Sequence, residues 1–477
     1  MKNDNAQIAI NNAIKSRNVA RSIARSEKDN VCDYDILTKH EVRTLLNATS
    51  NSDCHTSCLL RLSLFLGRSI DALLDASCEF IMPNANHAFG GYSFLAVRRD
   101  YPHLHLESLS MEDLNNLGYV PIPKELTNCF SDLKANELTE QGTMELIESA
   151  KALVRAVNMK HNSRLTLGRI TRYFRFYCTH NNKSEVRYGV IAGKEMQHHA
   201  GTYYTALQSA QVVELQQSYA DFLNDDNDRS LFTLPTSNNQ RYWGSLRLAK
   251  PEDVTSYFAK LKTQCKATAH RHNIIASANN YLAYTLAILQ LSTGHRPENE
   301  AFGTIDMFNL EVGQVFIDDK ESGSNHRRIV TLCDTAFAQL RYYIEHLKAL
   351  RRLSKGVYPH IFEGVQEILN GQAPLLSYIK DEHFQHDTPL FEPAEIAKHE
   401  APGVKNYYRH LIRTHLEKVD FPSDLIDCFL GHESKRDHSW ARYSALSMKH
   451  SKDLSHEVES MLKSLKISPH KSALEEW

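Results

Sequence analysis

Residues 281–297, YLAYTLAILQLSTGHRP, decide the fold of the C-terminal half of this chain. Apolar residues follow one another at helical spacing, which predicts a buried helix over 275–292. The apolar run is too short to span a membrane, and a His and an Arg soon follow it. The box TGHRP at 293–297 therefore places Arg296 directly after a core helix.

A second polar feature lies in a predicted β-hairpin further along the chain. The β-branched runs 315–317 (VFI) and 328–332 (RIVTL) flank the polar stretch 318–327, DDKESGSNHR. Two such runs around a loop rich in Gly, Ser and Asn are typical of a hairpin. The hairpin loop carries Lys320.

Three more features follow in order. The sequence HLIR at 410–413 lies in a helix predicted over 404–418, where His410 and Arg413 share one face. The box LGH at 430–432 ends a helix predicted over 423–430, and Tyr443 follows it. Taken singly, each of these residues is usually ordinary surface or core. Their ordered combination is what indicates a function.

The combined residue types fit the cleavage of a phosphodiester. Two guanidinium groups can grip both non-bridging oxygens and stabilise the charge of the transition state. A Tyr phenol can act as the nucleophile when a base takes its proton. A Lys near the scissile bond can protonate the leaving alkoxide, so this chemistry requires no metal and no cofactor.

At these residues, over about 265–455, the chain resembles the tyrosine recombinase (phage integrase) family. That family carries T-G-x-R, a hairpin Lys, H-x-x-R, L-G-H and a nucleophilic Tyr in this order. The resemblance implies a fold that is mainly α with a small β-sheet or hairpin. It implies these roles: Arg296 and Arg413 as catalytic arginines, Lys320 as general acid, His410 as base, His432 as a donor to the scissile phosphate, and Tyr443 as the nucleophile that forms a 3′-phosphotyrosine.

The N-terminal half contains a faint echo of the same order. LGR at 66–68 lies at the centre of an apolar segment, 59–75, that is predicted to be helical, and HNSR at 161–164 matches H-x-x-R. AGK at 192–194 then precedes YYTAL at 203–207, which resembles YSAL at 443–446. Two interpretations stay open: a degenerate duplicate of the catalytic fold, or chance matches in a helical DNA-binding region.

The sequence pattern and the resemblance predict five parts of the chain. These are an N-terminal arm over 1–40, a helical DNA-binding domain over 41–220, a linker with core-binding helices over 221–264, the catalytic domain over 265–455, and a charged tail over 456–477. We expect the tail, from 451 onward, to be a mobile helix.

Composition restricts how DNA could bind. The 477 residues hold 55 Lys and Arg against 57 Asp and Glu, a net charge of −2, which excludes attraction over the whole surface. Positive charge must therefore gather locally. The predicted DNA contacts are Lys266, Arg271, Arg327, Arg328, Arg351 and Arg352. Nine scattered Cys, an odd number, indicate reduced thiols and a cytoplasmic protein without a metal site.

The sequence thus predicts a site-specific integrase of a mobile genetic element. Its expected partners are double-stranded DNA and further copies of itself, as a dimer or tetramer on DNA, or other recombinases; no membrane is expected. The alternatives are a catalytically silent DNA-binding or regulatory member of the same fold, and relaxation of DNA in the manner of a type IB topoisomerase.

Overall fold

The computed structural model describes most of the chain, which is mainly helical with small antiparallel sheets. The described residues are 35–50, 54–75, 78, 80–81, 92–98, 117–135, 139–194, 200–224, 231–236, 242–245, 248–268, 274–296, 302–318, 327–380, 383–385, 406–432 and 446–476. Most of the predicted arm and the residues Arg271, Lys320 and Tyr443 lie outside them. In the described part, no helix is long and apolar enough to cross a membrane.

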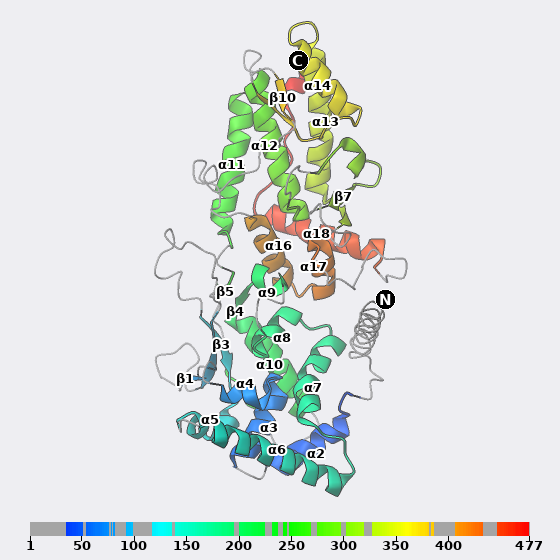
Figure 1. Cartoon of the computed structure of the whole chain (residues 1–477). Coiled ribbons are helices and arrows are strands. Elements are labelled where there is room, and N and C mark those ends of the chain that lie inside the picture. Colours follow the sequence, from blue (N-terminus) through cyan, green and yellow to red (C-terminus); the bar gives the residue numbers. More distant parts are fainter. Residues whose placement is uncertain are drawn as a thin grey trace, which may run out of the picture. The chain divides into compact units, whose positions relative to one another are not determined.

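The chain forms two compact units (Figure 1). Unit 1 comprises residues 1–196 and 207–244, and unit 2 comprises 197–206 and 245–477. This division differs from the five predicted parts. The predicted linker 221–264 is shared between the units, because its first residues complete a helix of unit 1 and its last residues belong to the helix Pro251–Ala267 of unit 2.

Unit 1 is built from helices around a three-stranded sheet. Its helices are α2 (Lys39–Ser50), α3 (His55–Leu66), α4 (Ile70–Leu74), α5 (Lys124–Ala135), α6 (Glu140–His161), α7 (Leu167–His180), α8 (Glu185–Ile191) and α10 (Ser209–Asn224). Its sheet has the order β1 (Phe80–Ile81), β2 (Phe94–Arg98), β3 (Leu117–Pro121). β4 (Ala206–Gln208) pairs with β5 (Tyr242–Gly244).

The single helix predicted over 59–75 is wrong, because a glycine divides it. α3 ends at Leu66, and Gly67 takes the left-handed conformation with φ 65°. Its N–H donates to the carbonyl of Ser63, which completes the helix end. A new short helix, α4, then begins after Ser69, whose hydroxyl accepts from the Ala72 amide. The break lets Arg68 turn inward, where it is 8% exposed.

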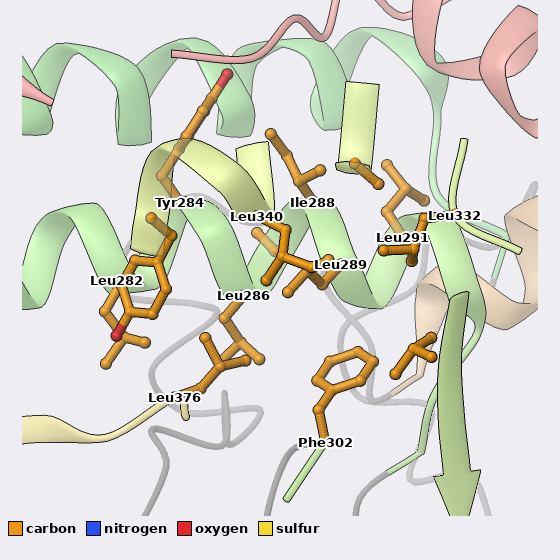
Figure 2. Packing of buried hydrophobic residues seen from close by; sticks show 14 of the residues in the cluster. Leu282, Tyr284, Leu286, Ile288, Leu289, Leu291, Phe302, Leu332, Leu340 and Leu376 are labelled. Atoms are coloured by element: carbon orange, nitrogen blue, oxygen red, sulfur yellow. The ribbon is translucent and has the colours of Figure 1, made fainter. Parts of the chain in front are cut away.

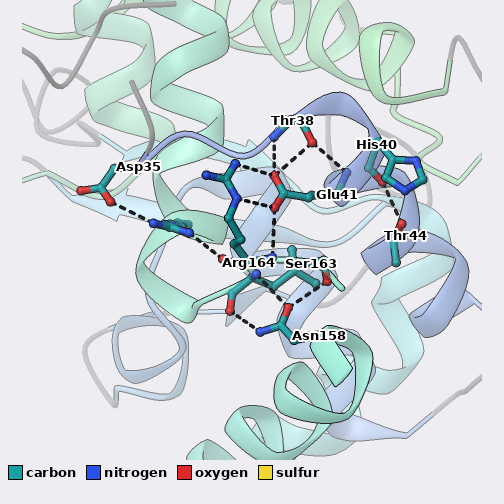
Figure 3. A network of polar contacts seen from close by, with 10 residues as sticks. Asp35, Thr38, His40, Glu41, Thr44, Asn158, Ser163 and Arg164 are labelled. Carbon is teal, nitrogen blue, oxygen red and sulfur yellow. Dashed lines mark hydrogen bonds and ion pairs between the residues drawn. The ribbon is translucent and has the colours of Figure 1, made fainter. Parts of the chain in front are cut away.

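A polar network joins the start of α2 to the turn between α6 and α7 (Figure 3). The guanidinium of Arg164 donates to Glu41 at 3.1 and 3.3 Å, and its backbone N–H donates to the same carboxylate at 3.0 Å. Thr38 adds a backbone donor at 2.8 Å. The apparent H-x-x-R at 161–164 therefore lies in a turn, where its Arg holds two helices together.

Ionisation of Glu41 makes the unfolding free energy of unit 1 depend on pH. Burial raises its pKa, but hydrogen bonds from Arg164 and Thr38 outweigh burial and lower the pKa to about 2. A depressed folded pKa stabilises the fold at pH above about 4.5, and this contribution disappears as pH falls toward 2. We expect Glu41→Gln to cost about 3 kcal/mol of unfolding free energy at pH 7 and little at pH 2.

Urea unfolding at pH 7, 4 and 2.5 measures this dependence. Glu148→Gln is the matched control, because Glu148 forms an exposed ion pair with Lys151. A difference in unfolding free energy between Glu41→Gln and the wild type that is the same at all three pH values would contradict the expectation.

Unit 2 contains the hairpin and most of the sequence boxes. Its helices are α9 (Ala200–Tyr204), α11 (Pro251–Ala267), α12 (Ile274–Thr293), α13 (Asp334–Ser354), α14 (Pro359–Leu369), α16 (Tyr407–Lys418), α17 (Ser423–Leu430) and α18 (Met448–Ser464), with short 3-10 turns η3 (Ile305–Met307) and η5 (Ala473–Glu476). Its strands are β6 (Phe308–Asn309), β7 (Gln314–Asp318), β8 (Arg327–Thr331), β9 (Tyr378–Lys380) and β10 (His383–Gln385).

The predicted hairpin is confirmed. β7 and β8 pair antiparallel from Gln314 opposite Thr331 to Asp318 opposite Arg327, and β6 adds a third strand. The predicted helices over 275–292, 404–418 and 423–430 are also confirmed, as α12, α16 and α17.

The core of unit 2 surrounds α12 (Figure 2). Leu286, Ile288, Leu289 and Leu291 are all fully buried, although they lie on different sides of the helix. A helix that is apolar on all sides must be enclosed by other elements. α11, α13 and α16 pack against it, and this packing fixes the position of its C-terminal end.

The helix predicted from 451 onward is confirmed as α18, but it packs into unit 2 instead of forming a loose tail. α18 buries Leu454, Val458, Met461 and Leu462, whose spacing forms one apolar face. The carbonyls of residues 468 and 470 accept from the phenols of Tyr284 and Tyr281 on α12. The tail is therefore anchored by burial and by hydrogen bonds to the core helix.

The element order of unit 1 recurs in unit 2. Each has a core helix that ends in a left-handed glycine (Gly67, Gly294), then a three-stranded antiparallel sheet, then helices. In the sheets, β2 with β3 and β7 with β8 form ladders of five residue pairs. One more bond extends each ladder, from Ile122 N to Ser93 O at 2.9 Å and from Leu332 N to Gly313 O at 2.8 Å.

Candidate phosphate-binding site

The end of α12 forms one side of the candidate site. Gly294 is left-handed at φ 64°, and a Cβ there would lie 2.6 Å from Leu430, so this position requires glycine. His295 is buried and accepts from the Phe302 amide through Nε2 at 3.2 Å. Arg296 is half-buried at the edge of the described residues.

α16 packs against Gly294, and almost all of its side chains are buried. Arg409 joins three sequence boxes: it donates to the carbonyl of Gly294 at 2.7 Å and to that of Leu430 at 2.5 Å, and its Nη2 lies 2.7 Å from Nε2 of His432. The described residues of the first box (293–296), the segment 406–413 and the box 430–432 therefore meet at one guanidinium. The H-x-x-R match drew attention to His410 and Arg413, and nothing in the spacing distinguished Arg409.

Arg413, on the next turn of α16, is paired with an acid. Its Nη1 lies 2.5 Å from Oδ1 of Asp427, and its Nε donates to Thr205 Oγ1 at 3.1 Å. Arg413 is 1% exposed and Asp427 is 26% exposed. Arg413 Nη1 also lies 3.4 Å from Nδ1 of His432. His432 is thus held between two guanidiniums, one at each ring nitrogen.

His410 contacts Ser245. It is 1% exposed, and its Nδ1 lies 2.5 Å from the hydroxyl of Ser245. The predicted proton transfer from Tyr443 to His410 involves a tyrosine outside the described residues. A nearby alternative nucleophile, Tyr407, is buried, and burial raises the pKa of its phenol well above the ordinary value.

Two tyrosines of α9 lie against this cluster. The ring of Tyr204 stacks on that of His432, with centroids 4.7 Å apart and planes 16° apart. It also lies 4.6 Å from the ring of His410, and the guanidinium of Arg409 is 5.2 Å from its centroid. The ring of Tyr203 is 5.5 Å from that of His410. The motif YYTAL was visible in the sequence, but its place at this site was not.

The six predicted DNA contacts fall into different environments. Lys266 and Arg352 are exposed on α11 and α13. Arg327 is exposed and paired with Asp318 at 2.8 Å, and Arg351 donates to Gln366 at 2.8 Å. Arg271 lies outside the described residues.

Arg328 is unlike the other predicted contacts, because it is only 2% exposed. Its Nη1 would lie 2.9 Å from a Cβ placed on Gly431. β8 therefore directs this arginine toward the LGH box rather than toward solvent.

The cluster contains two guanidiniums, one imidazole and one carboxylate. The carboxylate of Asp427 lies 2.5 Å from Nη1 of Arg413 and 3.9 Å from Nδ1 of His432, and Arg409 contacts the other ring nitrogen of His432. Among the described residues, no group of three or more His, Cys, Asp or Glu could hold a metal ion. Guanidiniums with a His are the groups that bind a phosphodiester anion.

Comparisons with family models, curated proteins and solved structures found no match for this chain.

Proposed function

We propose that the chain is a DNA strand transferase that cuts and rejoins double-stranded DNA by the chemistry of tyrosine recombinases. One observation carries the proposal: Arg409 brings the TGHRP box, the HLIR helix and the LGH box into contact around His432. These boxes are separated in the sequence, and residues from all of them must lie close together to act on one phosphate. The biological role would be integration or excision of a mobile element in the cytoplasm.

The reaction follows from the residue types. Arg296 and Arg413 would hold the two non-bridging oxygens, and His432 would donate a hydrogen bond to one of them. The Tyr443 phenol would lose its proton to His410 and attack phosphorus. A 3′-phosphotyrosine bond forms while the bond to the 5′ oxygen breaks, and Lys320 would protonate that oxygen. The 5′-hydroxyl released from a second copy's substrate would then attack the phosphorus of the 3′-phosphotyrosine. The bond to Tyr443 breaks, its phenol is released, and the new phosphodiester joins the exchanged strands.

We also infer that unit 1 is a decayed copy of unit 2. The parallel order of elements supports this, and so do the contacts of the two glycines. A Cβ on Gly67 would meet Phe174 and Thr171, and a Cβ on Gly294 would meet Ile412 and Arg409. Phe174 and Thr171 on α7 have the same spacing as Ile412 and Arg409 on α16.

Only one of the catalytic groups has a counterpart on α7: Arg175 follows Thr171 by four residues, as Arg413 follows Arg409. Thr171 stands where α16 has Arg409, and Lys194 stands where the LGH box has its His. Arg68 is buried and donates to the carbonyls of Ile191 and Val190, so it closes the end of α8. A unit with this fold but without most of these groups is suited to binding DNA or to regulation rather than to cleavage.

A suicide substrate tests the proposed reaction. Duplexes from the DNA that flanks the gene, nicked so that the cleaved end diffuses away, would trap a covalent adduct visible on a denaturing gel. We expect the wild-type chain and Tyr242→Phe, a change at an exposed tyrosine, to form the adduct, and Tyr443→Phe to lose it. DNA binding without any adduct would favour the silent DNA-binding alternative. Relaxation of supercoils without strand exchange would favour the topoisomerase alternative.

A further inference from the structure

The segment 200–206 enters unit 2 and lies on the groups that would hold the scissile phosphate. We propose that it is an autoinhibitory plug, which DNA must displace before cleavage. The inference rests on the proposed function, because it assigns the cluster of Arg409, Arg413 and His432 to phosphate. It goes further by assigning a regulatory role to Tyr204.

Hydrogen bonds fix the backbone of the plug. Thr205 Oγ1 donates to the carbonyl of Gly201 at 2.7 Å and accepts from Arg413 Nε at 3.1 Å. The amide of Ala206 donates to Thr414 Oγ1 at 3.0 Å, and the carbonyl of Thr205 accepts from the Ser245 amide at 3.2 Å. The plug is thus attached to two successive residues of α16.

The plug leaves no space for a phosphate on Arg413. A Cβ on Gly201 would lie 2.3 Å from Arg413 Nη2 and 2.9 Å from its Cζ. The plug backbone is therefore in direct contact with the guanidinium. A phosphate oxygen must approach a guanidinium nitrogen to about 2.7–2.9 Å, so it would have to take the position of this backbone.

Tyr204 covers Arg409 and His432. Its ring stacks on His432 at 4.7 Å and receives the Arg409 guanidinium at 5.2 Å. Tyr204 is 8% exposed, and Arg409 and Arg413 are 3% and 1% exposed. Aromatic stacking and cation–π contacts hold the ring without a covalent bond, so the anionic phosphates of the DNA backbone can compete with it.

The sequence around Tyr204 resembles the sequence around Tyr443. Tyr204-Thr205-Ala206-Leu207 repeats the pattern of 443–446, Tyr-Ser-Ala-Leu. If unit 1 is a decayed copy, Tyr204 is the counterpart of the nucleophile Tyr443. Both tyrosines would then suit the same cluster. The plug therefore competes with Tyr443 as well as with DNA.

Removing the ring should release the site. We expect Tyr204→Ala to raise the initial rate of adduct formation on the nicked duplex at least tenfold, with Tyr204→Phe near the wild-type rate because the ring remains. Circular dichroism and thermal unfolding verify that both variants are folded. An unchanged rate in Tyr204→Ala would overturn the proposal. Loss of the adduct in Tyr204→Phe would also overturn it, since Tyr204 would then be a nucleophile.

Locking the plug should have the opposite effect. Ala206→Cys with Thr414→Cys places thiols where the Ala206 amide contacts the Thr414 side chain. After oxidation, and with the disulfide verified by mass spectrometry, we expect no adduct; a reductant should restore it. Each single-Cys variant, oxidised in the same way, controls for the native cysteines. Full activity of the locked form would refute the plug.

Hydrogen exchange separates this proposal from the proposed reaction. If no variant forms an adduct, the reaction fails, but displacement can still be measured at a DNA concentration that saturates a gel shift. We expect peptides covering 200–206 to exchange faster when the duplex is bound, and a peptide from α6 to remain unchanged. Exchange over 200–206 that is equal with and without bound DNA would reject the plug even if cleavage occurs.

Discussion

Arg409→Lys should lower the rate of covalent adduct formation about a hundredfold or more, the effect of removing one preorganised donor from an active site. A planar guanidinium reaches the carbonyls of Gly294 and Leu430 and Nε2 of His432 together. A Lys ammonium keeps the charge but lacks the fork geometry, so it cannot hold all three groups. His432 would lose its fixed orientation, and the end of α12 would separate from the end of α17.

Single-turnover assays at saturating DNA measure this effect apart from binding. Lost contacts to two buried carbonyls also cost about 1–3 kcal/mol each, so the folded fraction must be determined first. Arg155→Lys, an exposed change on α6, is the matched control and should react like the wild type. A folded Arg409→Lys variant with the wild-type rate would show that the junction of the three boxes plays no part in catalysis.

Much of unit 2 could be predicted because local sequence pattern determines it. The alternation of β-branched residues gave the β7–β8 pairing, and the apolar run gave α12. The tail was misjudged because its charged residues hide an apolar face at Leu454, Val458 and Met461. A count at helical spacing over that segment would have found this face.

The site was predicted less completely, for a physical reason. Sequence spacing shows that His410 and Arg413 share a helix face, but not which face of α16 turns toward α12 and α17. That rotation is set by the packing of unit 2, and it makes Arg409 the link between the boxes. The place of residues 200–206 depends on contacts with residues that are distant in the sequence, such as Thr414, which periodicity does not encode.

Asp427→Ala should destabilise unit 2 by about 3–5 kcal/mol, because it leaves the buried charge of Arg413 without its carboxylate. Nη1 of Arg413 lies 2.5 Å from Oδ1 of Asp427, and the arginine is 1% exposed. Because Arg413 itself is almost fully buried, water that enters beside it compensates only part of the lost partner. Hydrogen exchange of the α16 and α17 amides, measured with urea unfolding, localises the loss to unit 2.

Removing both charges should recover most of this stability. In Arg413→Met with Asp427→Ala no unpaired ion remains, and buried pairs replaced by apolar groups are often neutral or stabilising. Asp318→Ala is the matched control, because Asp318 and Arg327 form an exposed pair, with side chains 33% and 59% accessible. That change should cost less than about 1 kcal/mol. If Asp427→Ala cost no more than Asp318→Ala, Arg413 would have another means of stabilisation, and its charge would be available to phosphate without Asp427.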